Sequence, residues 1–320
     1  MPEIRPFREE DRAAVVTLDT REQPPHRRYT AAQSQRWDSE MSGQEVFIRL
    51  VSGDPAIAYL QVTDFNTIRR PMPNVCHMHL IVAPEHRQRG IGSALFARAL
   101  AFARERNAYN LSVDIVAHSP DEPGYEFLKK RGFWELERQQ PSYLDLTTFD
   151  LSRFADARKR AEQEGVRLLA YADLPDTTEQ RRAFHDLWTR LEADTPHRYT
   201  LRFKQEAFEQ WVQSIIEQPE WTPEAAILAE SAGRWIGLTT LRFREETNIG
   251  DTWLTGVLPE YRGRGIATAL KLRAIEVAKE RGCPVITTGN QQDNAPMLAI
   301  NRKLGFVAEP AMVLYITELR

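Results

Sequence analysis

Apolar residues along the chain follow the spacing of strands in some segments and of helices in others, and the same succession occurs twice. The runs CHMHLIV at 76–82 and DTWLTGV at 251–257 resemble strands, and each precedes a segment whose apolar residues recur at helical spacing. These residues are Leu95, Ala99 and Phe102 in the first segment and Leu270, Ala274 and Val277 in the second. Each half also begins with a strand and helices and ends with a further helix and strands. This order predicts an α/β (α+β) fold in which helices cover a mixed central sheet.

The two halves also share sequence. PEHRQRGIGSAL at 84–95 and PEYRGRGIATAL at 259–270 are identical at eight of twelve positions, at a constant offset of 175. FLKKRGF in the first half likewise resembles NRKLGF in the second. A spacing of this size is that of a domain rather than of a short repeat. We therefore predict two copies of one fold in tandem, residues 1–150 and 151–320, connected through a helix that Gly165 ends.

The composition is that of an ordinary globular protein. Hydrophobic residues make up 42% of the 320 residues and charged residues 27%, and the net charge is −3. This balance gives no general attraction to nucleic acid, and no apolar run approaches the roughly 20 residues of a membrane span. Cys76 and Cys283 are too few for a disulfide framework or a cysteine metal site, and the start MPEIRPFREEDR does not resemble a secretory signal. We therefore expect a cytoplasmic protein without a metal, a nucleic acid or a membrane as partner.

The repeated turn R-x-R-G-I-G/A, between a strand and a helix, has the residues of a phosphate-binding site. Glycine lets the backbone approach a ligand closely, and the first turn of the helix offers unpaired N–H groups at the positive end of its dipole. Neither turn has the lysine of a P-loop, and Leu95 and Leu270 occupy the place of a third small residue in a Rossmann fingerprint. The two turns contain four arginines, which can hold phosphate oxygens: Arg87, Arg89, Arg262 and Arg264.

The pattern V-x-P-E-x-R-x-R-G-x-G/A-S/T-A-L before a helix, with a final L/R-G-F about 40 residues later, resembles the GNAT superfamily of acetyltransferases. The resemblance covers nearly the whole chain, and two such domains in tandem are similar in layout to mycothiol synthase. It implies that the amides of each turn bind the pyrophosphate of acetyl-CoA, while the preceding strand splays from its neighbour and pairs with the pantetheine arm. The implied cofactor residues are Val82, Arg87, Gln88, Arg89, Gly90, Ile91, Gly92 and Ser93 in the first copy and Val257, Arg262, Gly263, Arg264, Gly265, Ile266, Ala267 and Thr268 in the second.

The second copy carries a further signature, TTGNQQDNAPMLAINRKLGF at 287–306. It resembles a T-x-N-x-x-x-N-x-x-M-x-x-x-N-x-x-L-G-F pattern in one branch of the superfamily, whose asparagines lie beside the cofactor or the reacting centre. Here these are Asn290, Asn294 and Asn301, and the first copy has none of them. We therefore expect the second copy to hold the better-preserved site and the first to be degenerate or a scaffold. The alternative is that these asparagines are helix caps and surface residues.

Acyl transfer to an amine needs a base that takes a proton from the ammonium form of the acceptor. The superfamily commonly places a carboxylate or a histidine six residues before the strand's valine, a position that is Asp251 in the second copy and Cys76 in the first. Glu245 lies close to Asp251 in sequence and is an alternative base. A cysteine of ordinary pKa is a poor base. His77 and His79 flank that position in the first copy, and strand alternation directs them to the face opposite to Cys76.

The acid that protonates the departing thiolate is a tyrosine in many members, four residues before the glycine of the final G-F. Those positions are Leu128 in the first copy and Asn301 in the second. This departure means that a tyrosine acid would have to come from elsewhere, and Tyr125 and Tyr315 are the candidates.

A P-H-R-Y-T element occurs in both copies, in the region where the superfamily builds its acceptor pocket. Its residues are His26 and Tyr29 in the first copy and His197 and Tyr199 in the second. One interpretation is that they bind the acceptor. The other is that Thr30 and Gln33 form a capping box for the helix that follows.

The residues together favour an acetyl-CoA-dependent N-acyltransferase. A bound primary amine would attack the thioester directly, and backbone N–H groups near Val257 would hold the carbonyl oxygen. A non-catalytic acyl-CoA-binding or sensing protein is one alternative, and a protein with one catalytic and one regulatory half is another. The acceptor is a small-molecule or peptide amine. The oligomeric state stays open between a monomer, whose halves form a pseudo-dimer, and a homodimer.

Overall fold

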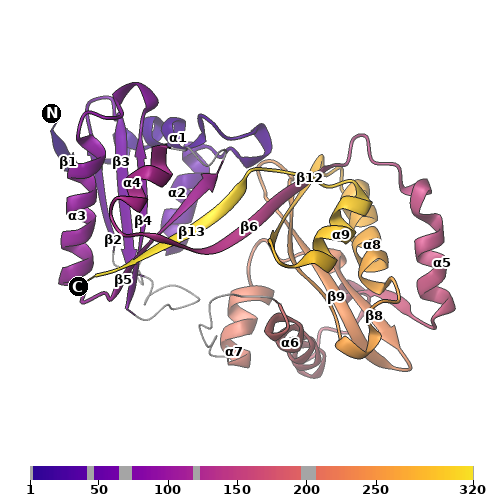
Figure 1. The fold of residues 1–320 in the computed structure, drawn as a ribbon. Helices are drawn as coiled ribbons and strands as arrows, with labels where there is room; N and C mark the ends of the chain where they lie inside the picture. The colour runs from indigo at the N-terminus through magenta and orange to yellow at the C-terminus, as the bar shows by residue number, and fades with distance from the viewer. Residues whose placement is uncertain (1–2, 42–46, 65–73, 118–122, 196–206, 320) are drawn as a thin grey trace. The chain divides into compact units, whose positions relative to one another are not determined.

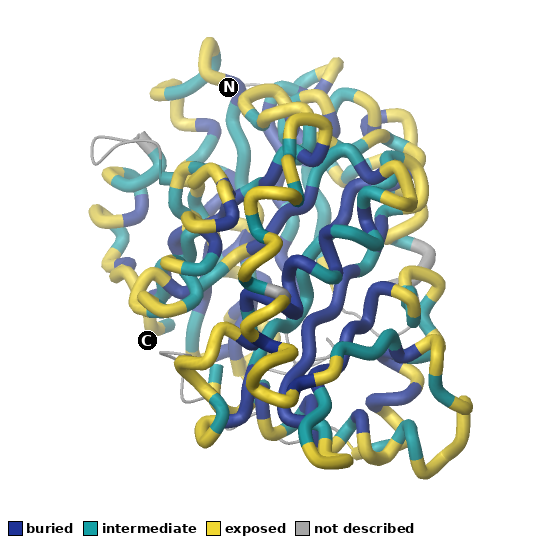
Figure 2. The backbone as a smooth tube through the Cα atoms, turned by 90° about the vertical axis from the view of Figure 1, so that its right-hand side faces the viewer, coloured by how far each residue is buried: buried dark blue, intermediate teal, exposed yellow. Residues whose placement is uncertain are grey.

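The computed structural model describes residues 3–41, 47–64, 74–117, 123–195 and 207–319. Contacts divide the chain into two compact units, residues 1–138 with 312–320 and residues 139–311. In each unit helices cover a mixed sheet, which confirms the predicted fold class (Figure 1). Buried positions follow the central strands, and exposed positions gather on outer helices and loops (Figure 2).

The sheet of the first unit has the strand order β1-β2-β3-β4-β5-β13. Strands β1 to β4 are antiparallel to their neighbours, whereas β4 and β5 are parallel. The strands are β1 (Ile4–Pro6), β2 (Phe47–Ser52), β3 (Ala58–Asp64), β4 (Val75–Val82), β5 (Asn110–Ala117) and β13 (Ala311–Glu318). The helices are α1 (Arg12–Thr20), α2 (Ala31–Met41), α3 (Ile91–Glu105) and α4 (Pro123–Lys129).

Alternation along β4 defines the two faces of this first sheet. Cys76 and Met78 are buried on the face that α3 covers. His77 and His79 point to the opposite face, where α1 packs and its Asp19 contacts His79. The predicted direction of the two histidines is therefore confirmed.

The sheet of the second unit has the strand order β6-β11-β10-β9-β8-β7, and β12 pairs with β6. Here β10 and β11 form the parallel pair. The strands are β6 (Trp134–Asp145), β7 (Arg167–Ala170), β8 (Ala226–Ser231), β9 (Arg234–Phe243), β10 (Gly250–Val257), β11 (Val285–Gln291) and β12 (Val307–Ala308). The helices are α5 (Ala155–Gln163), α6 (Thr178–Ala193), α7 (Phe208–Trp211), α8 (Ile266–Glu280) and α9 (Ala295–Leu304). Helix α8 packs with α5 and α9, and α6 covers the other face of the sheet (Figure 1).

The strand that closes each sheet comes from the other repeat in sequence. β13, at the end of the second repeat, belongs to the first unit. Residues 139–145 of β6 belong to the second unit, where they pair antiparallel with β11. The domains 1–150 and 151–320, which follow the repeat, stay a prediction, and the packing units cross that boundary. Because β5 and β11 are equivalent strands, each offers the same kind of edge to a closing strand.

Three helix-end signals in the sequence correspond to hydrogen-bonded or left-handed ends in the structure. Gly165, with φ of +71°, follows α5 just before β7. Asn294 caps α9, since its Oδ1 accepts a hydrogen bond from the amide of Met297 at 3.3 Å. At the start of α2, Thr30 N donates to Gln33 Oε1 at 2.7 Å and Gln33 N donates to Thr30 Oγ1 at 3.2 Å. The last pair is a capping box.

The described ranges contain no helix that is long and apolar enough to cross a membrane. Cys76 and Cys283 are both buried free thiols. Burial, with a smaller effect of the nearby Asp64, raises the pKa of the Cys76 thiol to about 11. Cys76 is therefore protonated at neutral pH and cannot serve as a base there.

The assignment of β13 to the first unit predicts where damage to this strand will appear. Val313 is fully buried and its neighbour Met312 is exposed. Replacing Val313 with Asp places an unpaired charge in the core, which costs several kcal/mol, whereas Met312→Asp is nearly neutral. Hydrogen exchange should therefore rise in β3, β4 and β5 for Val313→Asp only. A rise confined to β8, β9 and β10 would contradict the assignment.

Candidate functional site

The two glycine turns lie between β4 and α3 and between β10 and α8. In the second unit Gly263 and Gly265 both have a left-handed backbone, with φ of +78° and +79°. In the first unit Gly90 has φ of +82°, but Gln88 stands in place of the earlier glycine, with φ of +58°. A non-glycine residue in this region is strained by about 1 kcal/mol. The first turn therefore keeps the same shape at some cost in stability.

Each turn leads into the start of a helix with unpaired amides. The first bonds of the two helices run from Ala94 N to Gly90 O at 3.0 Å and from Ala269 N to Gly265 O at 3.1 Å. The amides of the three preceding residues consequently point out of each helix end. A Cβ built on Gly263 or Gly265 would meet no atom within 4 Å among the described residues. Open space beside outward amides fits a phosphate, as expected for the pyrophosphate of acetyl-CoA.

The first arginine of each turn contacts the strand before it. Arg87 Nε donates to Val82 O at 3.0 Å, and Arg262 Nε donates to Val257 O at 2.9 Å. Arg262 also forms an ion pair with Asp194 at 2.8 Å. These two arginines hold the end of each strand against its turn, a role that the sequence alone did not suggest.

The remaining cations lie at the helix starts. Arg89 and Arg264, the second arginines of the turns, are exposed. In the first unit Arg131, just after α4, stacks over Phe127 with 3.6 Å between its Cζ and the ring centroid. Its Nη2 donates to Ser93 Oγ at 2.8 Å. Arg131 thus places a guanidinium at the start of α3, and its position before the final G-F was the sequence signal for it.

In each unit the parallel strands separate before they end. Within the described strands, β4 and β5 stop pairing at His77 and Ser112, although β4 continues to Val82. β10 and β11 stop pairing at Asp251 and Thr287, although β10 continues for six more residues. The C-terminal halves of β4 and β10 therefore keep unpaired backbone groups on one side, directly before the glycine turns. An extended arm that contains amides can pair with such an edge.

A hydrogen-bonded group of three side chains lies on the α1 face of the first unit. His79 Nε2 on β4 is 3.2 Å from Asp19 Oδ1 on α1, and Tyr29 donates its hydroxyl proton to Asp19 Oδ2. Burial acts to raise the pKa of Asp19, but the hydrogen bonds from His79 and Tyr29 hold it below its ordinary value. The structure therefore brings together His79 and Tyr29, two predicted residues, through Asp19, which sequence analysis missed.

A second group lies on the same face, one step earlier along β4. His77 Nδ1 is 3.0 Å from Ser112 Oγ, and its Nε2 is 3.7 Å from Asp114 on β5. Burial lowers the pKa of His77 to about 4. Burial also raises the pKa of Asp114 to about 6, and nearby Glu137 adds to the effect. Groups with shifted pKa values thus gather where β4 and β5 separate, as is common in catalytic sites.

The polar character of this face extends toward β2 and α2. Arg49 on β2 forms an ion pair with Asp38 and donates to Gln61 Oε1 at 2.9 Å. Asp38 also pairs with Arg12 at 2.8 Å, and Tyr59 donates to Gln61 at 2.7 Å. The first unit therefore packs α1 and α2 on its sheet through a connected polar network.

On the corresponding face of the second unit, aromatic and aliphatic side chains pack between α6 and the sheet. Trp188 on α6 packs edge-on against Trp253, with 5.6 Å between ring centroids. A Cβ on Gly256 would lie 3.0 Å from the Cβ of Leu191, so α6 approaches the sheet as closely as this glycine allows. β10 also has a bulge between Thr252 and Thr255, whereas β4 pairs with β3 without interruption.

The predicted base of the second copy is held in an ion pair. Both oxygens of Asp251 accept hydrogen bonds from Arg244, each at 2.9 Å, and Thr287 donates to one of them. Glu245 lies in the turn between β9 and β10, at the end of β10 remote from its glycine turn. Glu245 thus lies near the start of β10 in the chain, and Asp251 already accepts three hydrogen bonds on its two oxygens.

The three asparagines of the second copy divide between two roles. Asn294 is the cap of α9 described above. Asn301 is buried, and its Nδ2 donates to Asn290 Oδ1 on β11 at 2.7 Å. The Oδ1 atom of Asn301 is buried without a hydrogen-bond partner in the described structure. Asn301 and Asn290 thus link α9 to the separated end of β11.

The remaining predicted residues fall in several places. His26 lies in the short 3-10 helix Pro25–Arg27, before α2. His197 and Tyr199 lie outside the described residues. The rings of Tyr125 on α4 and Tyr315 on β13 are 5.9 Å apart, so both candidate acids belong to the first unit.

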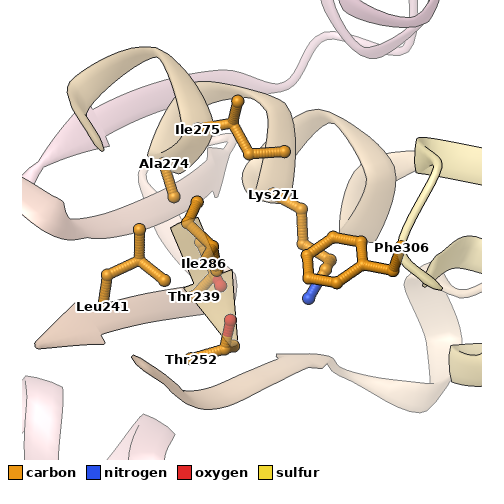
Figure 3. A pocket seen from close by; sticks show the side chains of 8 residues that line it. All are labelled: Thr239, Leu241, Thr252, Lys271, Ala274, Ile275, Ile286 and Phe306. Carbon is orange, nitrogen blue, oxygen red and sulfur yellow. The ribbon is translucent and has the colours of Figure 1, made fainter. Parts of the chain in front are cut away.

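A buried lysine in the second unit was missed by the sequence analysis. Lys271 on α8 is 4% exposed, and its Nζ lies 5.1 Å from the ring centroid of Phe306. Figure 3 shows its side chain reaching past Phe306 toward the strands that carry Thr239 and Thr252. These residues line a small cavity with Leu241, Ala274, Ile275 and Ile286. An amine between Leu270 and Leu272, on a helix otherwise apolar there, was the available signal.

Comparison with known proteins gives a family match to both halves. The model of the acetyltransferase (GNAT) family matches residues 12–133 and 184–306, together more than half of the chain. Mycothiol acetyltransferase of Streptomyces bingchenggensis is 23% identical over 302 residues, covering 90% of this chain and 87% of that protein. Mycothiol acetyltransferase of Thermobispora bispora is 25% identical over 276 residues, covering 84% and 82%.

Two solved structures resemble the full length of the chain. A GCN5-related N-acetyltransferase from Sphaerobacter thermophilus has a TM-score of 0.75 at 20% identity, covering 99% of this chain and 96% of that one. A tandem GNAT protein from the clavulanic acid biosynthesis pathway has a TM-score of 0.73 at 21% identity, covering 100% and 99%. At these identities the likeness establishes the fold.

The burial of Lys271 predicts how the free energy of unfolding depends on pH. Burial lowers its pKa from the ordinary 10.5 to about 8. Below pH 8 both folded and unfolded chains carry the proton, so the full cost of burying the charge, about 3 kcal/mol, is present. Between pH 8 and 10.5 the unfolded chain binds more protons, and the stability of the wild type rises with pH.

We therefore expect Lys271→Met to stabilise the protein at pH 7 and to lose this advantage by pH 10.5. Urea unfolding of the second unit at the two pH values measures the difference. Lys303→Met, at an exposed lysine of α9, is the control. An advantage that does not change with pH would contradict the expectation.

Proposed function

The chain belongs to the GNAT acetyltransferase family, and we propose that it transfers an acetyl group from acetyl-CoA to a primary amine of a small molecule or peptide. Two features of the chain's own backbone support the cofactor. Amides point outward from the starts of α3 and α8, and the halves of β4 and β10 before them have no paired strand on one side. Acetyl-CoA, when bound, supplies the acetyl group as an activated thioester.

The group formed by His79, Asp19 and Tyr29 is the observation that carries the proposal. An amine acceptor must lose a proton before it can attack, and a histidine suits this role near neutral pH. With its Nε2 donating to Asp19, the ring of His79 keeps a lone pair on Nδ1. The side chain of His79 is 45% exposed, so Nδ1 can take the proton directly or through water.

The residues of the first unit also suit the remaining steps. The unpaired amides of β4 beyond His77 can donate to the carbonyl oxygen as negative charge develops on it. Tyr125 on α4 is a candidate proton donor to the departing sulfur, since α4 begins against β5, where Gly124 approaches Ile115. Direct attack in a ternary complex needs no residue of the chain as a nucleophile.

We assign the acceptor to the first unit rather than the second. The sequence favoured the second copy because of its asparagines and Asp251. The polar network of the first unit offers hydrogen-bonding groups to an acceptor, whereas Trp188, Trp253 and Leu191 pack closely between α6 and the sheet of the second. Asp251 is also engaged by Arg244. These contacts favour one catalytic half and one half that binds coenzyme A in another role.

The acceptor is a polar amine. Asp19, Asp114 and Glu137 add negative charge to the face that carries His77 and His79, which favours a cationic acceptor. The relatives named above are mycothiol acetyltransferases, which supports a small-molecule amine as the acceptor. A non-catalytic acyl-CoA-binding protein is the competing proposal, and thiol release with a panel of amines separates the two.

Removing the imidazole of His79 should slow the reaction without weakening cofactor binding. We expect His79→Gln to lower kcat/KM by about 10² to 10⁴, and Asp19→Asn to cause a smaller loss because it disturbs only the orientation of the ring. The affinity for acetyl-CoA, measured by calorimetry, should stay unchanged. His86→Gln, at a histidine of the 3-10 helix Pro84–His86, is the control. Full activity of His79→Gln would overturn the assignment of the base.

The two turns can be tested separately. Replacing Gly90 or Gly265 with Glu puts a side chain at positive φ and a negative charge where phosphate is expected. We expect calorimetry to find about two coenzyme sites in the wild type and one in each variant, with catalysis lost in Gly90→Glu only. Loss of catalysis in Gly265→Glu alone would return the active site to the second unit. Absence of any coenzyme binding would refute the proposal.

A further inference from the structure

The side chain of Lys271 is buried in the second unit, and it lines a small cavity there. No hydrogen bond or ion pair to it is found among the described residues, and the ring of Phe306 at 5.1 Å is its polarisable neighbour. A buried ammonium normally has an ion-pair or hydrogen-bond partner, because desolvation of the charge is costly. An unpaired one therefore points to a partner that is not part of the chain.

The first unit shows that the fold does not require this lysine. At the repeat offset of 175 the corresponding residue is Phe96, and the shared final G-F, at an offset of 173, makes Phe133 the counterpart of Phe306. Phe96 and Phe133 pack against each other with 6.1 Å between ring centroids, and Arg131 lies over the outer side of Phe96 at 5.2 Å. The second unit thus has a buried cation where the first unit packs an aromatic ring.

The cavity beside Lys271 lies where β10 and β11 begin to separate. Thr252 on β10 follows the last paired residue, and Ile286 on β11 belongs to the preceding pair. An arm that starts at the turn around Gly265 and follows the unpaired edge of β10 toward Thr252 ends at this point. The inner end of the coenzyme arm would therefore meet the cavity.

The size of the cavity limits what can enter it. Its free space holds about one water molecule, which is close to the volume of a single sulfur atom. A terminal thiol needs about this much space, whereas an acetyl thioester, with three more heavy atoms, would have to displace the side chains that line it. A cation in that position also favours a sulfur that can accept a hydrogen bond or carry negative charge.

We propose that the second unit binds free coenzyme A in preference to its acetyl thioester, with the Lys271 ammonium donating a hydrogen bond to the thiol sulfur. The inference rests on the proposed coenzyme site at the turn around Gly265. It gives the non-catalytic half a function, since free coenzyme A is the product of the transfer in the first unit. The second unit is then a product-sensing site.

The test compares three ligands in the Gly90→Glu background, where the first turn is closed: coenzyme A, acetyl-CoA and desulfo-coenzyme A, which lacks the sulfur. Calorimetry should give coenzyme A an affinity about tenfold or more above the other two, as expected for one charge-assisted hydrogen bond. In Lys271→Met the three affinities should agree within about twofold. Lys271→Phe, which copies the first unit, is the second variant, and Lys303→Met is the control.

The outcomes separate the two proposals. Equal affinity of all three ligands in the Gly90→Glu parent would overturn the role of Lys271 while leaving the coenzyme site in place. A preference for coenzyme A that survives in Lys271→Met would do the same. Failure of all three ligands to bind would refute the coenzyme site itself, and the inference with it.

Discussion

The early separation of two parallel strands is the constraint on which both sites depend. A parallel pair normally satisfies its backbone groups along its whole length, but β4 and β10 lose their partners after two or three residues. The unpaired edge is tolerable only because it faces an opening that solvent or a ligand can fill. The turn that follows adds helix amides at the end of the same opening, and Arg87 and Arg262 hold the strand ends in place. Backbone geometry, rather than any single side chain, therefore forms the glycine turn and the unpaired strand edge in both units.

The two copies differ mainly in what covers the same opening. In the first, α1 and α2 meet the sheet through charged and hydroxyl side chains, which form hydrogen bonds and ion pairs with one another. In the second, α6 meets it through tryptophan and leucine, and a buried lysine, Lys271, lies on the α8 side. Lys271 stands at the place that Phe96 occupies in the first unit. The two copies thus share the geometry of their strands and turns, and they differ in the side chains that lie between the helices and the sheet.

The fold and the two glycine turns could be predicted from the sequence because they depend on contiguous residues. The repeated turn and the final G-F are short contiguous motifs. The capping residues Thr30, Gln33 and Asn294 form hydrogen bonds to residues only three positions away. Asp19 could not be found in this way, because it meets His79 only after α1 docks on the sheet. The ion pair of Asp251 depends on the register of β9 and β10, and Lys271 is unusual only because of its burial. The sequence also could not show that β13 completes the first sheet and β6 the second. The two similar halves offer equivalent edges, β5 and β11, to either strand.

The exchange of closing strands affects how the chain can be made. During synthesis the first sheet emerges with β5 at an open edge, and the strand that completes it is translated only after the whole second unit. An incomplete sheet with an unpaired edge is prone to pair with other chains. The amino-terminal half must therefore wait for the end of translation before it is complete, and the two halves mature together although each has its own core. Such a chain cannot be divided into two independently expressed halves at residue 150 without removing a strand from both.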